Sequence, residues 1–144
     1  MTLNNTNARL TLHTTQEVMG EVQTSLVNED AFFSKKGDKY YIMYRERDEN
    51  GLSENKVSLI VSEDVVTVTR SGSINARLVY KEDEKTETNY RMPYGVLNVE
   101  VYTRKIEFLE KSNGFHLMLD YDISIGEEKL KTCLKINVEK RSNE

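Results

Sequence analysis

The chain has 144 residues, of which 38% are hydrophobic and 31% charged, a composition typical of one globular domain and unlike that of a collagen, a mucin or a disordered segment. Its 24 acidic and 20 basic residues are interspersed and give a net charge of −4, which argues against nucleic-acid binding because that needs a concentrated excess of Lys and Arg. No apolar run approaches the ~18 residues of a membrane helix, and the N-terminus lacks the apolar core of a signal peptide. The one cysteine cannot form an internal disulfide. We therefore expect a soluble cytoplasmic protein without membrane contacts.

From residue 8 onward, apolar and polar residues alternate in segments of about five to twelve residues, separated by turn-forming stretches. No segment carries an apolar stripe at helical spacing over more than about ten residues. The pattern therefore predicts an all-β chain. The expected strands, in chain order, are 8–18, 21–34, 39–47, 55–62, 65–71, 74–80, 86–92, 96–108, 115–125 and 129–140.

The short connections between these segments indicate the topology. Strands in simple succession form a meander, and a long meander curls through its twist until closure removes its edges. A Greek-key sandwich would need a long crossing connection, and every candidate connection here is short. We predict a single antiparallel up-and-down barrel of about eight to ten strands over residues 1–144, with 1–7 and 140–144 as flexible tails.

The segment VLNVEVYTRKIEF (96–108) changes phase partway along its length. Val101 and the apolar residues before it share one parity, whereas Ile106 and Phe108 share the other, so one regular strand face cannot hold them all. An inserted residue near positions 103–105 would reconcile the two halves. We predict a β-bulge there; the alternative is that the strand ends at Thr103 and a loop follows.

Extending the apolar parity along the strands places several polar side chains inside the barrel. An isolated buried guanidinium costs several kcal/mol, so Arg70 should have a partner, and Glu46 is the inward-facing acid that parity offers. Besides this pair, the inward polar set is rich in tyrosines, namely Tyr40, Tyr44, Tyr80, Tyr90, Tyr94 and Tyr121.

Two interpretations of this inward set remain open. In one, the barrel holds a small ligand with an apolar body and a polar or anionic head group, against walls expected from Leu78, Met92, Leu97 and Leu119. The ligand-binding residues would then be Tyr44, Glu46, Arg70, Tyr80, Tyr94 and Tyr121. In the other, the barrel is filled by its own side chains, and the protein is a structural or interaction module that acts through its surface, with a homodimer as one form.

Three stretches carry a resemblance to a known family: TVTRSG (67–72), NYRMPYGVLNVEVYT (89–103) and LDYDISIG (119–126). They resemble the YwiB-like family of small bacterial cytoplasmic proteins. The resemblance implies a calycin-type β-barrel with an internal cavity, and the family has no assigned biochemical function. It extends from about Leu10 to Val138, and Arg70, with the Ser-Gly that follows it, matches one of the family's motifs.

The sequence offers little for catalysis, metal binding or a cofactor. It contains no P-loop, GxSxG elbow or dinucleotide-binding glycine motif. His13 and His116 fall on outward parity, which leaves too few ligands for a zinc site. Asp120 and Asp122 share one strand face, but their parity is also outward. We therefore expect no catalytic residue, no metal, no cofactor and no enzymatic activity.

Overall fold

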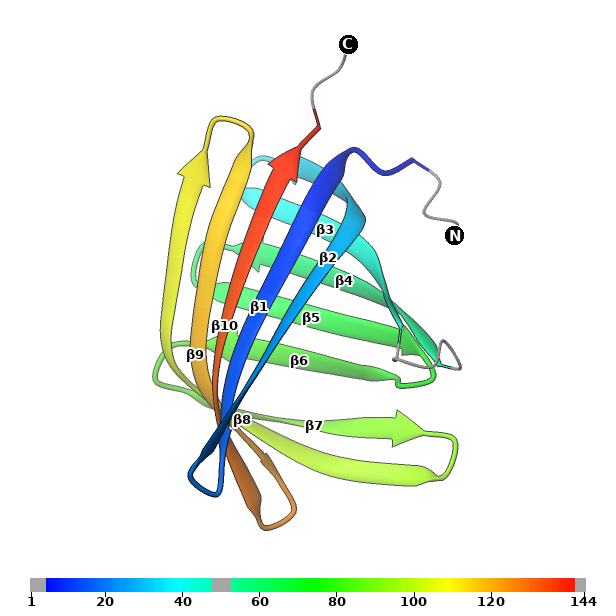
Figure 1. Cartoon of the computed structure of the whole chain (residues 1–144), viewed down its shortest axis with the longest axis vertical. Coiled ribbons are helices and arrows are strands. Elements are labelled where there is room, and N and C mark those ends of the chain that lie inside the picture. Colours follow the sequence, from blue (N-terminus) through cyan, green and yellow to red (C-terminus); the bar gives the residue numbers. More distant parts are fainter. Residues whose placement is uncertain (1–4, 48–52, 142–144) are drawn as a thin grey trace.

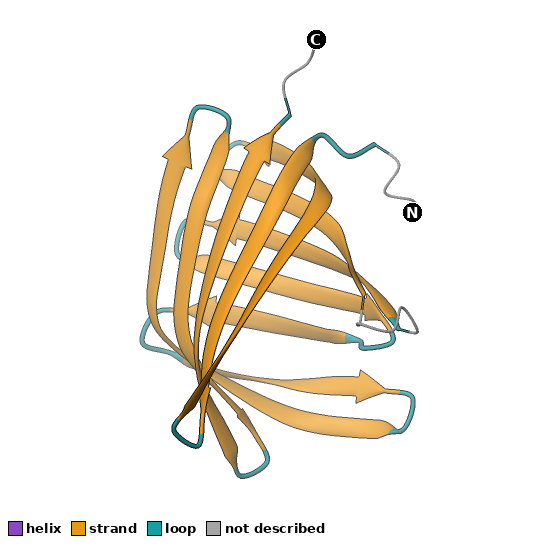
Figure 2. Ribbon diagram, in the orientation of Figure 1, coloured by secondary structure: helices purple, strands orange, loops and turns teal. Residues whose placement is uncertain are grey.

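The computed structural model describes residues 5–47 and 53–141, and within these ranges the ordered elements are strands and no helix occurs (Figures 1 and 2). Consequently, no helix in the described ranges could span a membrane. The all-β prediction is confirmed. The strands are β1 (Ala8–Val18), β2 (Glu21–Lys36), β3 (Lys39–Arg47), β4 (Glu54–Ser62), β5 (Val65–Gly72), β6 (Ala76–Lys81), β7 (Lys85–Met92), β8 (Gly95–Lys111), β9 (Gly114–Ile125) and β10 (Glu128–Lys140).

All ten strands belong to one antiparallel sheet in the order β6-β5-β4-β3-β2-β1-β10-β9-β8-β7. The two ends of the chain meet in its middle, where β1 pairs with β10 from Ala8↔Lys140 to Glu17↔Lys131. The outer strands β6 and β7 come together through an isolated bridge between Asn75 and Arg91. The sheet is therefore a nearly closed barrel, as the short connections predicted.

The wall of the barrel opens along β2. This strand pairs with β1 over residues 21–31, but it pairs with β3 only over residues 32–36. Figure 1 shows β2 and β3 side by side at one end of β2 and diverging toward the other. The first ten residues of β2 thus have a strand neighbour on one side only.

The β-bulge predicted in β8 is present. Thr103 pairs with Tyr121 and Lys105 pairs with Asp120, so Arg104 is the extra residue. The insertion lets both halves of the strand face the core, because Val101 lies opposite Ile123 and Ile106 lies opposite Leu119 on β9. Val101 is buried, and Ile106 is half-buried against the core.

Aromatic side chains fill one end of the barrel. The rings of Phe33 and Phe115 meet edge to face with their centroids 5.7 Å apart, and Tyr40 lies against Phe108 at 4.9 Å. The hydroxyl of Tyr40 donates to the carboxylate of Glu110. This end of the core is packed by the protein's own side chains and leaves a pocket of only about 90 Å³ beside Tyr40 and Phe108, so a larger ligand site would have to lie elsewhere in the interior.

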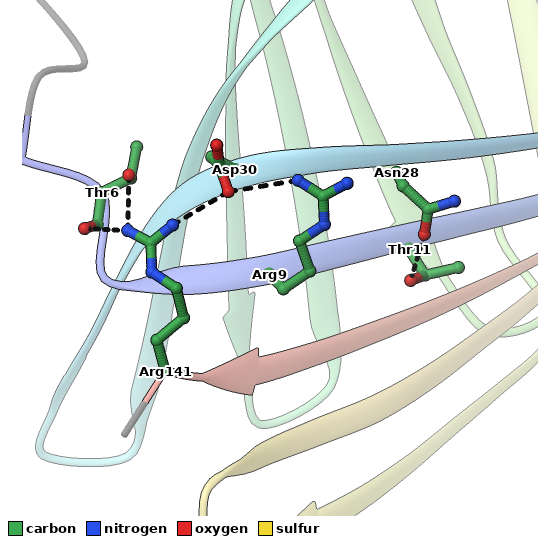
Figure 3. Close-up of polar contacts among 6 residues, drawn as sticks. All are labelled: Thr6, Arg9, Thr11, Asn28, Asp30 and Arg141. Atoms are coloured by element: carbon green, nitrogen blue, oxygen red, sulfur yellow. Dashed lines mark hydrogen bonds and ion pairs between the residues drawn. The ribbon is translucent and has the colours of Figure 1, made fainter. Parts of the chain in front are cut away.

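The segments expected to be tails are tied to the barrel where they adjoin it. Arg141 donates to both oxygens of Thr6, and its Nη1 lies 2.9 Å from Asp30 on β2, which also pairs with Arg9 (Figure 3). The side-chain amide of Asn7 exchanges two hydrogen bonds with the Phe33 backbone. The outermost residues of both expected tails lie outside the described ranges.

Candidate functional site

An interior cavity of about 280 Å³ lies away from the aromatic end. Its wall comes from both sides of the opening along β2, with Ser25 and Val27 on β2 and Tyr44 and Glu46 on β3. The apolar part of the lining comprises Leu12, Leu59, Val68, Leu78, Ile123, Leu134 and Ile136. The other half of the lining carries polar groups, and a combination of apolar wall and polar groups is the usual composition of a small-molecule site.

The charged centre of the cavity wall is an ion pair between β5 and β3. Arg70 Nε lies 3.0 Å from Glu46 Oε1, and Nη2 lies 3.1 Å from Oε2, so the two planar groups form a bidentate contact. The side chain of Arg70 is 20% exposed and that of Glu46 is 35% exposed. Within the described part of the chain, Nη1 of Arg70 makes no hydrogen bond. The predicted pairing is confirmed, and the guanidinium keeps donors for another group.

Asn55, at the start of β4, positions the carboxylate of this pair. It is buried, its Nδ2 donates to Glu46 Oε1 at 3.0 Å, and its Oδ1 accepts from the backbone of Ile74 at 2.8 Å. Gly72 lies beside it with a φ of +146°, where a Cβ would collide with the carbonyl oxygen of Glu54. Only glycine therefore fits at the end of the Arg-Ser-Gly element.

Burial and pairing act in opposite directions on the two charges. Burial by itself would raise the pKa of Glu46, but the hydrogen bond and the charge of Arg70, together with the Asn55 amide, lower it below its ordinary value. Burial likewise favours loss of the proton from Arg70, but the Glu46 carboxylate outweighs it and raises the pKa of the guanidinium. Both groups are charged at neutral pH.

Four tyrosines complete the polar side of the cavity: Tyr44, Tyr80, Tyr90 and Tyr121. Burial is the main cause of their raised pKa values, and it raises the pKa of Tyr44 to about 12, so its hydroxyl stays neutral and able to donate. The rings of Tyr80 and Tyr121 meet edge to face with centroids 4.8 Å apart. Phenol groups and the free guanidinium edge thus border the same space.

The expectation for Tyr94 is wrong. The residue is 84% exposed, because it lies in the turn between β7 and β8, where strand parity no longer applies. The pairing of β8 with β9 begins only at Val99. The residues of β8 before it therefore project beyond β9, and Leu97 is 43% exposed. Of the four expected wall residues, Leu78 lines the cavity, whereas Met92, Leu97 and Leu119 do not.

Several lining residues were not predicted from the sequence. Thr14 continues the parity of Leu12, so the alternation of β1 could have indicated it. Ser25 and Val27 had no such signal, because most of β2 is exposed on both faces and its residues do not alternate clearly. Asn55 was missed because a polar residue at the start of a strand is usually part of the turn.

A larger groove of about 730 Å³ lies on the outside of β1, β8, β9 and β10. His13 and His116 line it and are exposed, as outward parity predicted. Asp120 and Asp122, on the same outer face, pair with Arg104. No cluster of three metal-ligating side chains occurs in the described ranges. Because the groove holds no buried pair of polar groups, the interior cavity is the better candidate site.

These features define a class of protein: a small, nearly closed antiparallel barrel with an ion pair and tyrosines at an interior cavity. The chain belongs to the family described as Domain of unknown function (DUF1934), whose model matches residues 10–136. It is 30% identical over 99 residues to the uncharacterized beta-barrel protein YwiB of Bacillus subtilis (strain 168), an alignment that covers 68% of each chain.

The fold of this family is also seen in a solved structure. The crystal structure of the ywiB protein from Bacillus subtilis matches 95% of this chain and 93% of its own, with a TM-score of 0.85 at 23% identity. The likeness establishes a common barrel fold. The family resemblance expected from the three sequence stretches is confirmed.

Proposed function

We propose that the protein is a non-enzymatic cytoplasmic binding module whose barrel takes a small ligand with an apolar body and a polar or anionic head group. The observation that carries this proposal is the juxtaposition of the Arg70–Glu46 pair with an open space of about 280 Å³. Donors that have no protein partner among the described residues, Arg70 Nη1 and the Tyr44 hydroxyl, border that space, and a ligand head group would satisfy them.

The size of the cavity limits the ligand. At ~30 Å³ per water molecule the space equals about nine waters, which suits a short acyl chain or a single aromatic ring better than a long lipid. The aliphatic lining residues, among them Leu12, Leu59 and Ile136, would hold the body of such a molecule. Glu46 neutralises much of the Arg70 charge, so its substitution is a direct way to ask whether the head group is anionic.

The test combines native mass spectrometry of the protein purified from its own cytoplasm with thermal shift against short fatty acids, acyl phosphates, aromatic carboxylates and nucleotides. A ligand should raise the melting temperature with its occupancy, and Tyr44→Phe should weaken that response while Tyr94→Phe, outside the cavity, should not. Glu46→Gln should strengthen the response to an anionic head group. No retained molecule and no shift with any compound would refute the proposal.

The alternative is a structural or interaction module with a filled barrel, and the aromatic cluster of Phe33, Tyr40, Phe108 and Phe115 favours it. The cavity lies just below the ~300 Å³ at which ligand sites usually begin. Under this alternative, the Arg70–Glu46 pair only holds β3 to β5. Arg70→Met combined with Glu46→Gln would then change stability without altering the response to any compound.

A further inference from the structure

The free edge of β2 is built to accept another strand. Every residue from Glu21 to Asn28 is exposed, including the apolar Val22 at 63% and Leu26 at 62%. Such an edge is usually blunted by lysine or proline, yet EVQTSLVNED (21–30) contains no Lys, Arg or Pro. Ten residues of edge without lysine or proline are sufficient for pairing with a peptide by strand addition.

Hairpin geometry identifies the free backbone groups. Met19 and Gly20 form a two-residue turn with φ values of 51° and 82°, and Val18 pairs with Glu21. In this turn the flanking pair exchanges both hydrogen bonds, and bonded pairs then alternate along the ladder. Odd-numbered residues of this part of β2 therefore bond to β1. The residues whose N–H and C=O groups point to the open side are Val22, Thr24, Leu26 and Asn28.

The charge of this edge selects its occupant. Glu21 and Glu29 have no ion-pair partner among the described residues, and both side chains point toward the inner face of the sheet because they share the parity of Ser25, which lines the cavity. If two copies paired edge to edge about Ser25, Glu21 of each copy would lie opposite Glu29 of the other. Like charges directly opposite destabilise a sheet, so in this register, which pairs the whole of residues 21–29, a second copy is a poor partner.

We propose that the free edge of β2 binds an extended peptide segment of another protein, one that carries basic residues opposite Glu21 and Glu29 and an apolar side chain opposite Ser25. The backbone of the segment would pair with the even-numbered residues of β2 and close the wall of the barrel. Its central side chain would project toward the interior, because Ser25 and Val27 line the cavity.

This proposal goes beyond the small-ligand function and does not rest on it. The edge would hold the segment through its backbone, its two acids and the apolar contact at Ser25, whereas the small ligand needs Arg70 and the tyrosines. Arg70→Met combined with Glu46→Gln alters the cavity and leaves the edge unchanged, so this variant should keep peptide binding even where it loses the response to a small ligand. The two proposals can therefore fail separately.

The test uses the full chain and a fluorescent nonapeptide, Lys-Thr-Val-Thr-Leu-Thr-Val-Thr-Lys, with a control in which Glu replaces both Lys residues. Anisotropy should show that the Lys-ended peptide binds at least about tenfold more tightly than the control. Hydrogen exchange should show that it protects residues 21–30. Thr24→Pro removes one of the free N–H groups and should weaken binding by a similar factor, whereas Thr24→Val keeps that group and should not.

A second variant covers the case in which Thr24→Pro fails to fold. Glu21→Lys combined with Glu29→Lys should reverse the preference, so that the Glu-ended peptide binds more tightly. Equal binding of the two peptides, no binding of either, or protection elsewhere in the chain would overturn the proposal. A dimer whose formation depends on β2 would also overturn it and would identify a second copy as the occupant.

Discussion

At the scale of single residues, hydrogen bonds to individual atoms hold Arg70 and Glu46 in place. Two donors of the guanidinium are matched to the two oxygens of Glu46, and Asn55 holds one of those oxygens from the other side. Neither charge is fully removed from water, because the side chains of Arg70 and Glu46 are 20% and 35% exposed. The pair is therefore less strongly coupled than a pair in a dry core, for which loss of one partner costs roughly 3–5 kcal/mol.

A double-mutant cycle at neutral pH measures this coupling. Arg70→Met with Glu46 in place should lower the free energy of unfolding by about 2–3 kcal/mol, because it leaves a half-buried carboxylate without its partner. The combined change Arg70→Met and Glu46→Gln should cost less than Arg70→Met alone. Denaturant unfolding of the four proteins gives both values. Additive losses would mean that the two residues do not interact energetically.

At the scale of the elements, the bulge in β8 turns one long strand into two segments that share a core. Arg104 is the inserted residue and lies on the outer surface, where it pairs with Asp120. Without the insertion, the strand beyond Thr103 would present Lys105 to the interior and Ile106 to solvent. The inserted Arg104 is therefore the cause of the change of phase in the sequence.

Alanine substitution at two consecutive residues tests this description of β8. Ile106→Ala should lower the free energy of unfolding by about 1–2 kcal/mol, because Ile106 is half-buried against the core. Lys105→Ala should change it by less than about 0.5 kcal/mol, since its side chain is 58% exposed and its ion pair with Glu107 lies at the surface. Thermal and urea unfolding supply the comparison. Equal effects of the two substitutions would contradict the assigned faces.

At the scale of the whole molecule, the pairing of β1 with β10 joins the two ends of the chain in the middle of the sheet. Each half of the barrel contributes side chains to one continuous core, and β1 and β10 hold the halves together. Loss of either strand would expose the edge of its neighbour and the apolar face of both halves. The barrel should therefore unfold as one unit.

Differential scanning calorimetry tests this cooperativity. The full chain should show one transition whose calorimetric and van't Hoff enthalpies agree, at roughly 100 kcal/mol near 60 °C if each residue contributes about 0.7 kcal/mol. A chain lacking residues 128–144, and with them β10, should show no cooperative transition. Two resolved transitions in the full chain would mean that the halves of the barrel unfold independently.

The sequence by itself determined the class of fold, the number and approximate limits of the strands, the bulge and the Arg70–Glu46 pair. The strands and the bulge are local consequences of alternation, because each strand records in its own residues which face is buried. The pair joins residues 24 apart, and parity indicated it only by placing both side chains on the inner face. The resemblance to the YwiB-like family, carried by three short stretches, was likewise visible before the structure. Tyr94 was misplaced because parity was extended through a turn, where it has no meaning.

Only the tertiary structure decided where the interior is filled and where it is open. Phe33, Tyr40, Phe108 and Phe115 come from four strands, and nothing in their spacing indicates that they gather at one end. The free edge of β2 depends equally on long-range geometry, because one and the same sequence can form a strand that is paired on both sides or a strand that is paired on one side. Cavities and open edges result from how strands diverge in space, and alternation along one strand carries no information about that divergence.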